Sequence, residues 1–353
     1  MTTRTVICAL LILPALGFSQ EIVQEKPAIT VEAIEISIRR GVDFLVSDQN
    51  SNGSWGSATR TKALNIYAPL PGADHAFRAG ASGLALAGLI DAADSRPQVS
   101  AAIDKAARWT AAELPKLRRA DQTTTYNVWG HAYGLRAISR LYRDEPNPAK
   151  KLEWARIAQQ QVDLLNRYAD VNGGWGYLDL FDEITTQKPS GIPTSFTTAT
   201  VLLALHQARQ VMDLKLDETI IKNAIQGINI QRTPDFAYTY SFNHRMRPRV
   251  EINRPAGSLA RSQACNAALR VFGEKAITDE ILTIWADRFL AREGFLNNGR
   301  KRPVPHEAKF KIAGYFYYYG IYYFTESVKF LPRETHAAYA QQLAAILLER
   351  QEK

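Results

Sequence analysis

Cysteine is nearly absent from this sequence of 353 residues, which contains only Cys8 and Cys265. Cys8 lies in the apolar segment at the N-terminus, so a chain that loses this segment keeps a single cysteine. No intrachain disulfide is then possible, and the fold must be stabilised by packing. Cys265 lies among Ala and Leu, and we expect it to be a small buried residue of the core.

Long apolar runs are also missing, apart from a short one at the N-terminus. Residues 1–19 contain the basic residue Arg4, an apolar run from Val6 to Leu16, and the small residues of Gly17-Phe18-Ser19. This order is typical of a secretory signal peptide. No later segment reaches the roughly 18 apolar residues of a membrane-spanning helix. We therefore predict export to the periplasm or the extracellular space, without an integral membrane segment after signal cleavage. An uncleaved anchor is the alternative.

Charge of one sign does not dominate the chain. The 43 Lys and Arg residues exceed the 35 Asp and Glu residues by a formal charge of +8. This modest excess favours anionic surroundings and indicates nothing sharper. No recognisable nucleic-acid-binding module is present, so we expect no nucleic-acid partner. The sequence does not indicate an oligomeric state.

Strand patterns are lacking, whereas two kinds of helical pattern alternate along the chain. The first kind is amphipathic, as in the segment where Ile34, Ile38, Val42 and Leu45 share one face. Similar runs lie near 98–114, 149–168, 216–231, 276–291 and 334–350. The second kind is apolar or small nearly all the way round and is therefore expected to be buried. These runs are 78–93, 127–142, 194–209, 257–273 and 313–328.

This alternation predicts an all-α fold of the α/α-toroid type, with buried helices inside and amphipathic helices outside. We expect a linker at residues 20–30 and a single toroid domain at 31–353. Because the amphipathic runs outnumber the buried ones by one, an inner position is either absent or filled by a segment of another type. A stacked solenoid is the competing interpretation, but its repeats would be more uniform.

The longest connections all follow amphipathic helices, at about 49–77, 170–193, 232–256 and 292–312. In an alternating ring they lie at one end, next to the N-termini of the inner helices. Long connections in compact domains are often functional. Free N–H groups and helix dipoles at this end favour anions. We therefore predict that an anionic ligand binds at the long-loop end.

One of these connections contains a sequence that returns later in the chain. The segment "RRGVDFLVSDQNSNGSWG" resembles the QW repeat of squalene and oxidosqualene cyclases and protein prenyltransferases, a superfamily with the α/α-toroid fold. It returns as "LLNRYADVNGGWG", with fainter echoes in "INIQRTPDFAY", "FLAREGFLNNG" and "LLERQEK". The resemblance implies that the repeat residues brace helices far from any chemistry: Gln49, Gly53, Trp55, Gly173 and Trp175. A stacking platform formed by Trp55 and Trp175 is the alternative.

The catalytic motifs of that superfamily are missing. The sequence has no DxDD tetrad, no DDxxD, and no Asp-x-Cys pair at Cys265. It also lacks HExxH, P-loop, CxxC and GxSxG motifs. We expect no cofactor and no metal, and the sequence leaves open whether the protein is an enzyme. The nearest acidic cluster is "DLFDE", which contains Asp179 and Asp182.

Basic and aromatic residues gather in the long connections. Arginine binds carboxylate, sulfate or phosphate with two parallel hydrogen bonds, and His or Tyr can serve as a general base. The candidate catalytic residues are Tyr240, His244, Asp179 and Asp182. The candidate ligand-binding residues are His75, Tyr177, Arg245, Arg247, Arg249, Arg254, Arg300, Arg302 and His306. Ordinary solvated loops would also be polar and basic.

Several functions fit this set of residues. The first is binding of a small molecule or an acidic glycan, such as a polyuronic or sulfated polysaccharide. The second is a polysaccharide lyase or hydrolase that acts on such a glycan. The third is a divergent isoprenoid cyclase with Asp179 or Asp182 as its acid, which requires a mainly apolar central cavity. The fourth is a protein-binding scaffold without catalytic activity.

Overall fold

The computed structural model describes residues 29–57, 73–117, 127–176, 191–300, 302 and 309–352. Regular structure in these residues is helical, which confirms the all-α prediction. Strand-like pairing within them is limited to two isolated bridges, Thr194–Ser241 and Arg232–Tyr238. Among the described helices, none is long and apolar enough to cross a membrane.

Six helices correspond to the amphipathic runs and five to the buried runs, and the two kinds alternate. The amphipathic helices are α1 (Val31–Ser47), α3 (Pro97–Glu113), α5 (Pro148–Arg167), α7 (Glu218–Ile230), α9 (Asp279–Arg300) and α11 (Arg333–Arg350). The buried helices are α2 (Ala73–Asp91), α4 (Asn127–Asp144), α6 (Ser195–Val211), α8 (Pro255–Val271) and α10 (Tyr315–Val328). Short 3₁₀ turns are η1 (Leu114–Lys116), η2 (Phe242–Met246), η3 (Glu251–Asn253) and η4 (Lys309–Lys311).

Local signals account for where many of these helices begin. The side chains of Thr30, Asn147, Thr194 and Asp217 each accept a hydrogen bond from a backbone N–H in the first turn of the following helix. Such caps satisfy donors that have no partner within the helix. Helices α3 and α8 have proline in the first turn and no side-chain cap, whereas α5 has both. The missing N–H of proline costs nothing at this position.

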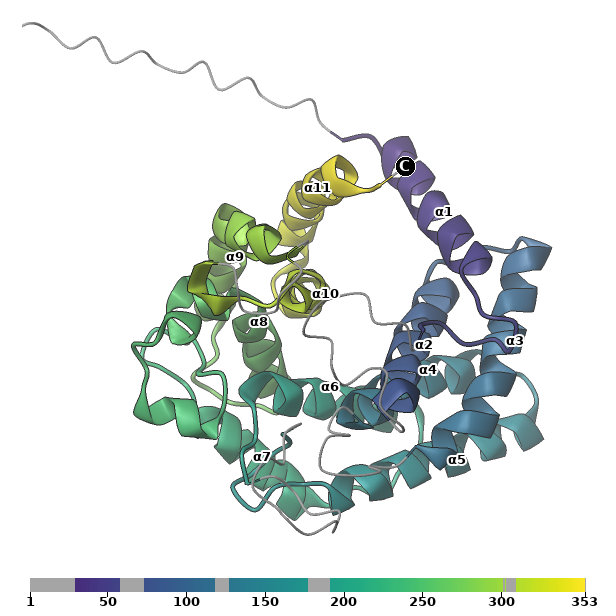
Figure 1. Cartoon of the computed structure of the whole chain (residues 1–353), viewed down its shortest axis with the longest axis horizontal. Coiled ribbons are helices and arrows are strands. Elements are labelled where there is room, and N and C mark those ends of the chain that lie inside the picture. The colour runs from purple at the N-terminus through teal and green to yellow at the C-terminus, as the bar shows by residue number, and fades with distance from the viewer. Residues whose placement is uncertain are drawn as a thin grey trace, which may run out of the picture.

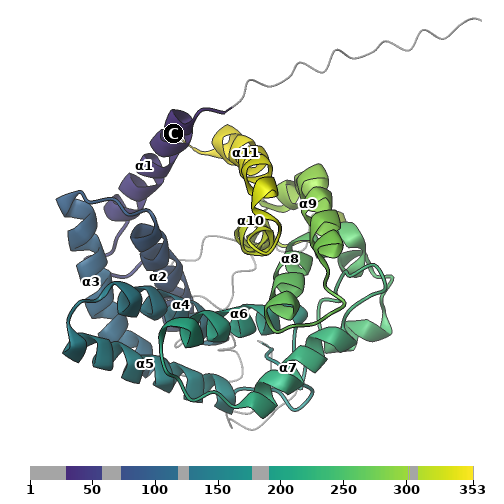
Figure 2. The same cartoon turned by 180° about the vertical axis from the view of Figure 1, so that it is seen from behind.

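The buried helices pack against one another in chain order, from α2 to α4, α6, α8 and α10. Figures 1 and 2 show them nearer the centre of the molecule than α3, α5, α7 and α9. Small residues permit this packing: a Cβ atom added to Gly83 would lie 2.7 Å from the backbone of Tyr133. In α8 every residue from Ala256 to Leu269 is buried. In α6 the residues from Ser195 to Leu205 are buried as well, so these two inner helices are surrounded by the core, as the sequence predicted.

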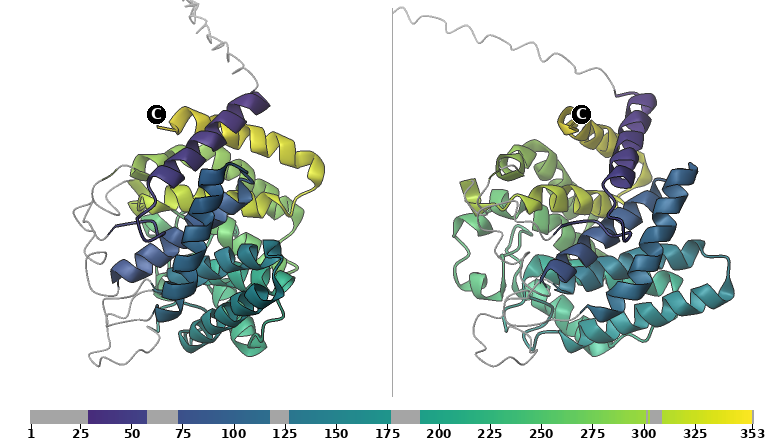
Figure 3. Two further views of the ribbon diagram at one scale, coloured as in Figure 1. Left: turned by 90° about the vertical axis from the view of Figure 1, so that its right-hand side faces the viewer. Right: turned by 45° about the vertical axis from the view of Figure 1, so that its right-hand side comes forward.

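The first and last helices meet. Nε2 of Gln351, which follows α11, donates a hydrogen bond to the carbonyl of Ser37 in α1, at 2.8 Å. Figure 3 shows the purple α1 and the yellow α11 crossing at one end of the molecule. No described inner helix lies between α10 and α2, and both expose side chains: Phe77 and Leu84 on α2, Tyr315 and Tyr318 on α10. The expected shortage of one inner helix holds for the described residues.

Two details of the predicted elements were wrong. Helix α9 continues to Arg300, so "FLAREGFLNNG" is helical and is not a turn of the repeat. The helix continues because Leu296 is fully buried and Phe295 packs edge-on against Phe310, with ring centroids 5.0 Å apart. On α1, Val42 is buried as predicted, but Ile38 is 50% exposed.

Candidate functional site

The two copies of the repeat sequence form the same turn. The indole N–H of Trp55 donates to the carbonyl of Leu45 at 2.7 Å, and that of Trp175 donates to Leu165 at 2.8 Å. The backbone N–H of each tryptophan donates to a hydroxyl on the next inner helix, Ser82 or Thr198. Both indoles are buried, so neither is a platform open to a ligand. Their contacts are those of a structural brace.

Glycine is required in both turns, and Gln49 reinforces the first. Gly53 and Gly173 have φ values of +97° and +87°, and an added Cβ would lie 2.4 Å and 2.2 Å from carbonyl oxygens of the next outer helix. Nε2 of Gln49 donates to the carbonyls of Gly53 and of Ala102 in α3. In the second copy the corresponding residue is Ala169, and the turn forms without this contact.

A third turn of the same hydrogen-bond pattern follows α7. The N–H of Thr233 donates to the carbonyl of Ala237, and the N–H of Phe236 donates to Thr233. Phe236 has a φ of 61° at the place where the first two turns have glycine. Tyr238 is buried after this turn, and its hydroxyl donates to Oδ1 of Asn266 at 2.7 Å. The faint echo "INIQRTPDFAY" is therefore a true structural repeat, and the chain that follows it carries Tyr240 and His244.

Tyr240 and His244 lie together, as the clustering of site residues in this loop suggested. Their ring centroids are 5.4 Å apart, and both side chains are partly buried. Tyr240 packs edge-on against Phe196 of α6 and Phe316 of α10, at 5.1 Å and 6.3 Å. Nδ1 of His244 lies 2.8 Å from the hydroxyl oxygen of Ser241. The pair thus lies at the N-terminal ends of two inner helices, on the predicted side of the molecule.

Two buried residues that the sequence analysis missed hold this loop in place. Oδ1 of Asn253 accepts the N–H of Tyr240 at 2.8 Å, and its Nδ2 donates to the carbonyls of His244 and Arg247. Arg261 of α8 donates to the carbonyls of Tyr238, Ile252 and Gly257. A charged residue inside an otherwise small and apolar helix was the signal that could have identified Arg261.

Burial sets the protonation of the pair. It raises the pKa of the Tyr240 phenol to about 12, although a hydrogen bond with Tyr315 and the charge of Arg261 act in the opposite direction. Burial also lowers the pKa of His244, and the charges of Arg261 and Arg247 lower it further. At neutral pH the site therefore holds a protonated phenol beside a neutral imidazole. The first can donate a proton and the second can accept one.

The predicted arginines fall into two separate groups. Arg245, Arg247, Arg249 and Arg254 are exposed in the chain segment that follows Tyr240, with the guanidinium of Arg245 3.8 Å above the ring of Phe242. The charge of Arg247 acts on His244. Arg300 lies elsewhere: its Nη1 is 3.7 Å from a carboxylate oxygen of Glu352, and its guanidinium lies over Tyr317. Arg302 is exposed just beyond α9.

The remaining predicted residues lie apart from the pair or outside the described residues. His75 is on α2, where its ring meets Trp109 of α3 edge-on. Tyr177, Asp179, Asp182 and His306 lie outside the described residues, so their roles stay predictions. Cys265 is fully buried, as expected, and burial raises the pKa of its thiol. In the part of the chain that the structure describes, no group of three or more His, Cys, Asp or Glu residues could hold a metal ion.

The tyrosine-rich helix α10 divides its phenols between the core and the surface. Tyr319 donates to the carbonyl of Phe196 at 2.9 Å, and Tyr323 donates to the hydroxyl of Thr200 at 2.9 Å. The hydroxyl of Tyr317 accepts a hydrogen bond from Arg350. Tyr315 and Tyr318 are exposed. The buried phenols of Tyr317, Tyr319 and Tyr323 thus all have hydrogen-bond partners, as buried polar groups usually do.

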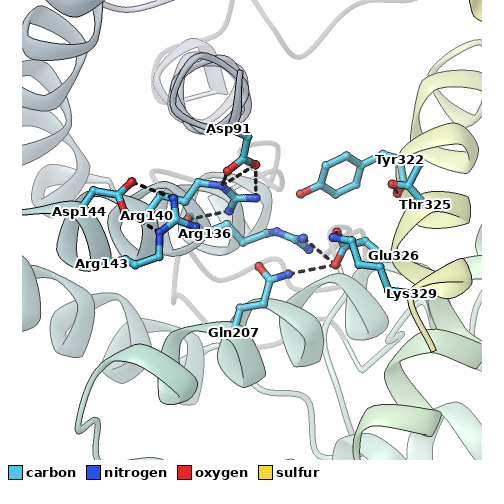
Figure 4. Close-up of polar contacts among 10 residues, drawn as sticks. All are labelled: Asp91, Arg136, Arg140, Arg143, Asp144, Gln207, Tyr322, Thr325, Glu326 and Lys329. Atoms are coloured by element: carbon cyan, nitrogen blue, oxygen red, sulfur yellow. Dashed lines mark hydrogen bonds and ion pairs between the residues drawn. The ribbon is translucent and has the colours of Figure 1, made fainter. Parts of the chain in front are cut away.

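A second polar cluster, which the sequence analysis missed, lies toward the C-terminal ends of the inner helices (Figure 4). Arg136 of α4 is 1% exposed, and its Nη2 lies 3.1 Å from Oε2 of Glu326 on α10. Glu326 also accepts from Gln207 of α6 and pairs with Lys329 at 2.7 Å. The guanidinium of Arg136 lies 4.8 Å from the ring centre of Tyr322. This cluster joins three inner helices through charge.

Comparison with protein-family models and with curated protein sequences finds no match for this chain.

Proposed function

We propose that the chain is an exported protein with an α/α-toroid fold of the squalene-cyclase-like class, and that it binds an acidic glycan beside Tyr240 and His244. The alternation of outer and inner helices and the meeting of α1 with α11 support the proposed fold. The repeated tryptophan turns support the proposed class, because bracing between helices is the role that the QW repeat has in that superfamily.

The observation that carries the ligand proposal is the packing of Tyr240 against His244 in a segment that also carries four exposed arginines. Aromatic rings offer flat faces to sugar rings, and arginines bind the carboxylates or sulfates that an acidic glycan carries. An uncharged isoprenoid would gain nothing from these positive charges. The buried charges of Arg136 and Glu326 in the inner layer also count against a mainly apolar cavity.

A lyase that acts on such a glycan is the second candidate, because the pair has complementary protonation states. The neutral imidazole of His244 would take the proton on the carbon next to the uronate carboxylate. The C–H electrons would form a C=C bond as the C–O bond to the leaving sugar breaks. The phenol of Tyr240 would donate its proton to the leaving oxygen, and Arg247 would bind the carboxylate.

Thermal unfolding in the presence of a polyuronide, a sulfated glycan or solubilised squalene tests the proposal. A ligand at one hundred times its Kd stabilises the folded protein by about 2.7 kcal/mol. We expect stabilisation by an acidic glycan, weaker at high salt because exposed charges are screened. Arg247→Gln and His244→Gln should reduce it, whereas Tyr318→Phe on the exposed face of α10 should not. Stabilisation by squalene alone would contradict the proposal.

The lyase candidate needs a separate measurement, the ultraviolet absorbance of the unsaturated uronate product. Turnover in the wild type and its loss in both Tyr240→Phe and His244→Gln would support it. Binding without turnover would leave the glycan-binding proposal standing and remove the lyase. No stabilisation by any acidic glycan in the panel would favour the scaffold.

A further inference from the structure

A pocket of about 530 Å³ lies between α2 and α3, beside the turn of the first repeat. Its walls include Asn52 from the turn, His75 and Arg78 from α2, and Arg108 and Trp109 from α3. The pocket belongs to none of the elements that carry Tyr240 and His244. It therefore needs its own explanation.

A polar atom without a partner is buried at this pocket. Nε2 of His75 is inaccessible to solvent and makes no hydrogen bond. Behind it lies His131 of α4, which is fully buried, and whose Nδ1 lies 2.8 Å from Oε1 of Gln161. Nε2 of His131 is also buried without a partner. Buried polar atoms are almost always satisfied, so such a group needs an explanation, and a water or a bound ion is one.

The charges at the pocket favour an anion. Arg108 is exposed and has no ion pair with any residue in the described ranges. The only acidic wall residue among those described is Glu113, and Lys116 already pairs with it at 2.7 Å. Among the described residues that line the pocket, two arginines stand against one carboxylate. Guanidinium groups bind the oxygens of phosphate, sulfate or carboxylate with charge-assisted hydrogen bonds.

The second repeat provides an internal comparison. Ser82 and Thr198 receive the tryptophan N–H in the two copies, while Lys105 and Asn223 lie against the turn glycines. When Ser82 is aligned with Thr198, Arg78 corresponds to Thr194. When Lys105 is aligned with Asn223, Arg108 corresponds to Gln226. Gly227 stands at the place of Trp109, and its Cα packs against the turn. The second copy braces its helices without a cation or an indole at these positions, so bracing does not explain Arg78, Arg108 and Trp109.

We infer that the pocket formed by His75, Arg78, Arg108 and Trp109 is a second binding site, which takes the oxyanion of a phosphorylated, sulfated or carboxylated molecule. Arg108 binds the anion from the solvent side, and the side chain of His75 forms part of the wall behind it. Trp109 forms another part of the wall. The site is independent of the proposed function, because it shares no residue with the Tyr240–His244 pair.

Titration of the full chain with inorganic phosphate, sulfate and acetate at low, constant ionic strength tests this inference. The readout is the indole N–H resonance of Trp109, assigned by its loss in Trp109→Phe. We expect a saturable shift of this resonance in the wild type. Arg108→Gln installs the residue found in the second copy, and it should raise Kd about tenfold, as should His75→Gln. The anion with the lowest Kd identifies the chemical group that the site binds.

Lys222→Gln is the matched control, since it removes an exposed positive charge from the outer helix of the second copy. It should change Kd by no more than about twofold. Equal weakening by Lys222→Gln and Arg108→Gln would mean unspecific attraction and would overturn the inference. A Trp109 resonance that does not respond to any of the three anions would overturn it as well. Arg108 is exposed, so its variant is expected to fold.

Discussion

Arg136 of α4 and Glu326 of α10 form a buried ion pair in the inner layer, with 3.1 Å between Nη2 and Oε2. Burial disfavours ionisation of Glu326, but the nearby positive charges of Arg136 and Lys329 outweigh it and hold its pKa below the ordinary value. Gln207 of α6 binds the same carboxylate oxygen at 3.0 Å. The pair therefore connects α4 and α10 directly, and α6 joins them through Gln207.

Removing either partner should destabilise the fold strongly. Arg136→Met and Glu326→Gln should each lower the free energy of unfolding by about 3–5 kcal/mol. The first leaves Glu326 with only the exposed Lys329 as a counter-charge, and the second leaves the buried Arg136 without its carboxylate. The double variant should lose less than the sum of the two. Chemical denaturation measures all three. Arg143→Met, which breaks the exposed pair with Asp144, is the control and should change stability by less than about 1 kcal/mol. Additive losses in the double variant would show that the pair is not coupled.

The turn glycines should be far less replaceable than a helical glycine. Gly173→Ala adds a Cβ 2.2 Å from the carbonyl oxygen of Asn223 at a φ of +87°, and the backbone must move to relieve it. Gly41→Ala in α1 meets nothing within 4 Å and should stabilise that helix by up to about 1 kcal/mol. The melting temperature should therefore fall in Gly173→Ala and rise in Gly41→Ala, relative to the wild type. A melting temperature for Gly173→Ala equal to that of the wild type would contradict the assigned turn.

The helices could be predicted from the sequence because apolar periodicity decides which face is buried, and both helix types gave clear patterns. The end of α9 could not, because Gly294, Asn297, Asn298 and Gly299 resemble a turn. Burial of Leu296 overrides that local preference.

The Tyr240–His244 pair was within reach of the sequence because both residues lie in one loop. Arg136 and Glu326 were not paired in advance, since they lie on helices far apart in the chain. An Arg in one buried helix and a Glu in another were nevertheless a signal, because buried charges need partners. The third repeat turn was faint because Phe236 stands in place of glycine.

If the protein is a lyase, its pH profile should have an acid limb and no alkaline limb near neutral pH. The pKa of His244 is lowered, so its neutral form persists below the ordinary histidine value of about 6.5. The rate should fall only as the pH drops through that lowered pKa. Tyr240, with a pKa of about 12, stays protonated throughout the accessible alkaline range. Initial rates across pH measure this. If the residual activity of His244→Gln has the same acid limb as the wild type, His244 is not the base.

Tyr240→Phe should lower kcat by about 10²–10⁴-fold while KM changes little, because the variant lacks the phenol proton that is donated to the leaving oxygen. A rise in KM at constant kcat would instead assign Tyr240 to binding.

His131 should make the fold sensitive to mild acid. Burial lowers its pKa to about 4, with the charge of His75 acting in the same direction, although the hydrogen bond with Gln161 opposes this. An unfolded histidine has a pKa near 6.5, so between pH 6.5 and 4 the unfolded chain binds the proton and the folded chain does not. Within this window the free energy of unfolding should fall by up to about 1.4 kcal/mol per pH unit, and below it the loss should stop.

His131→Gln removes this contribution while keeping a polar group for Gln161. His75, His244 and the acidic residues are common to both proteins, so the difference between wild type and variant isolates His131. Urea unfolding at a series of pH values should show that difference shrinking as the pH falls from 6.5 to 4. A difference that is constant over this range would mean that His131 takes up its proton in the folded state, and that water or a ligand reaches its buried Nε2.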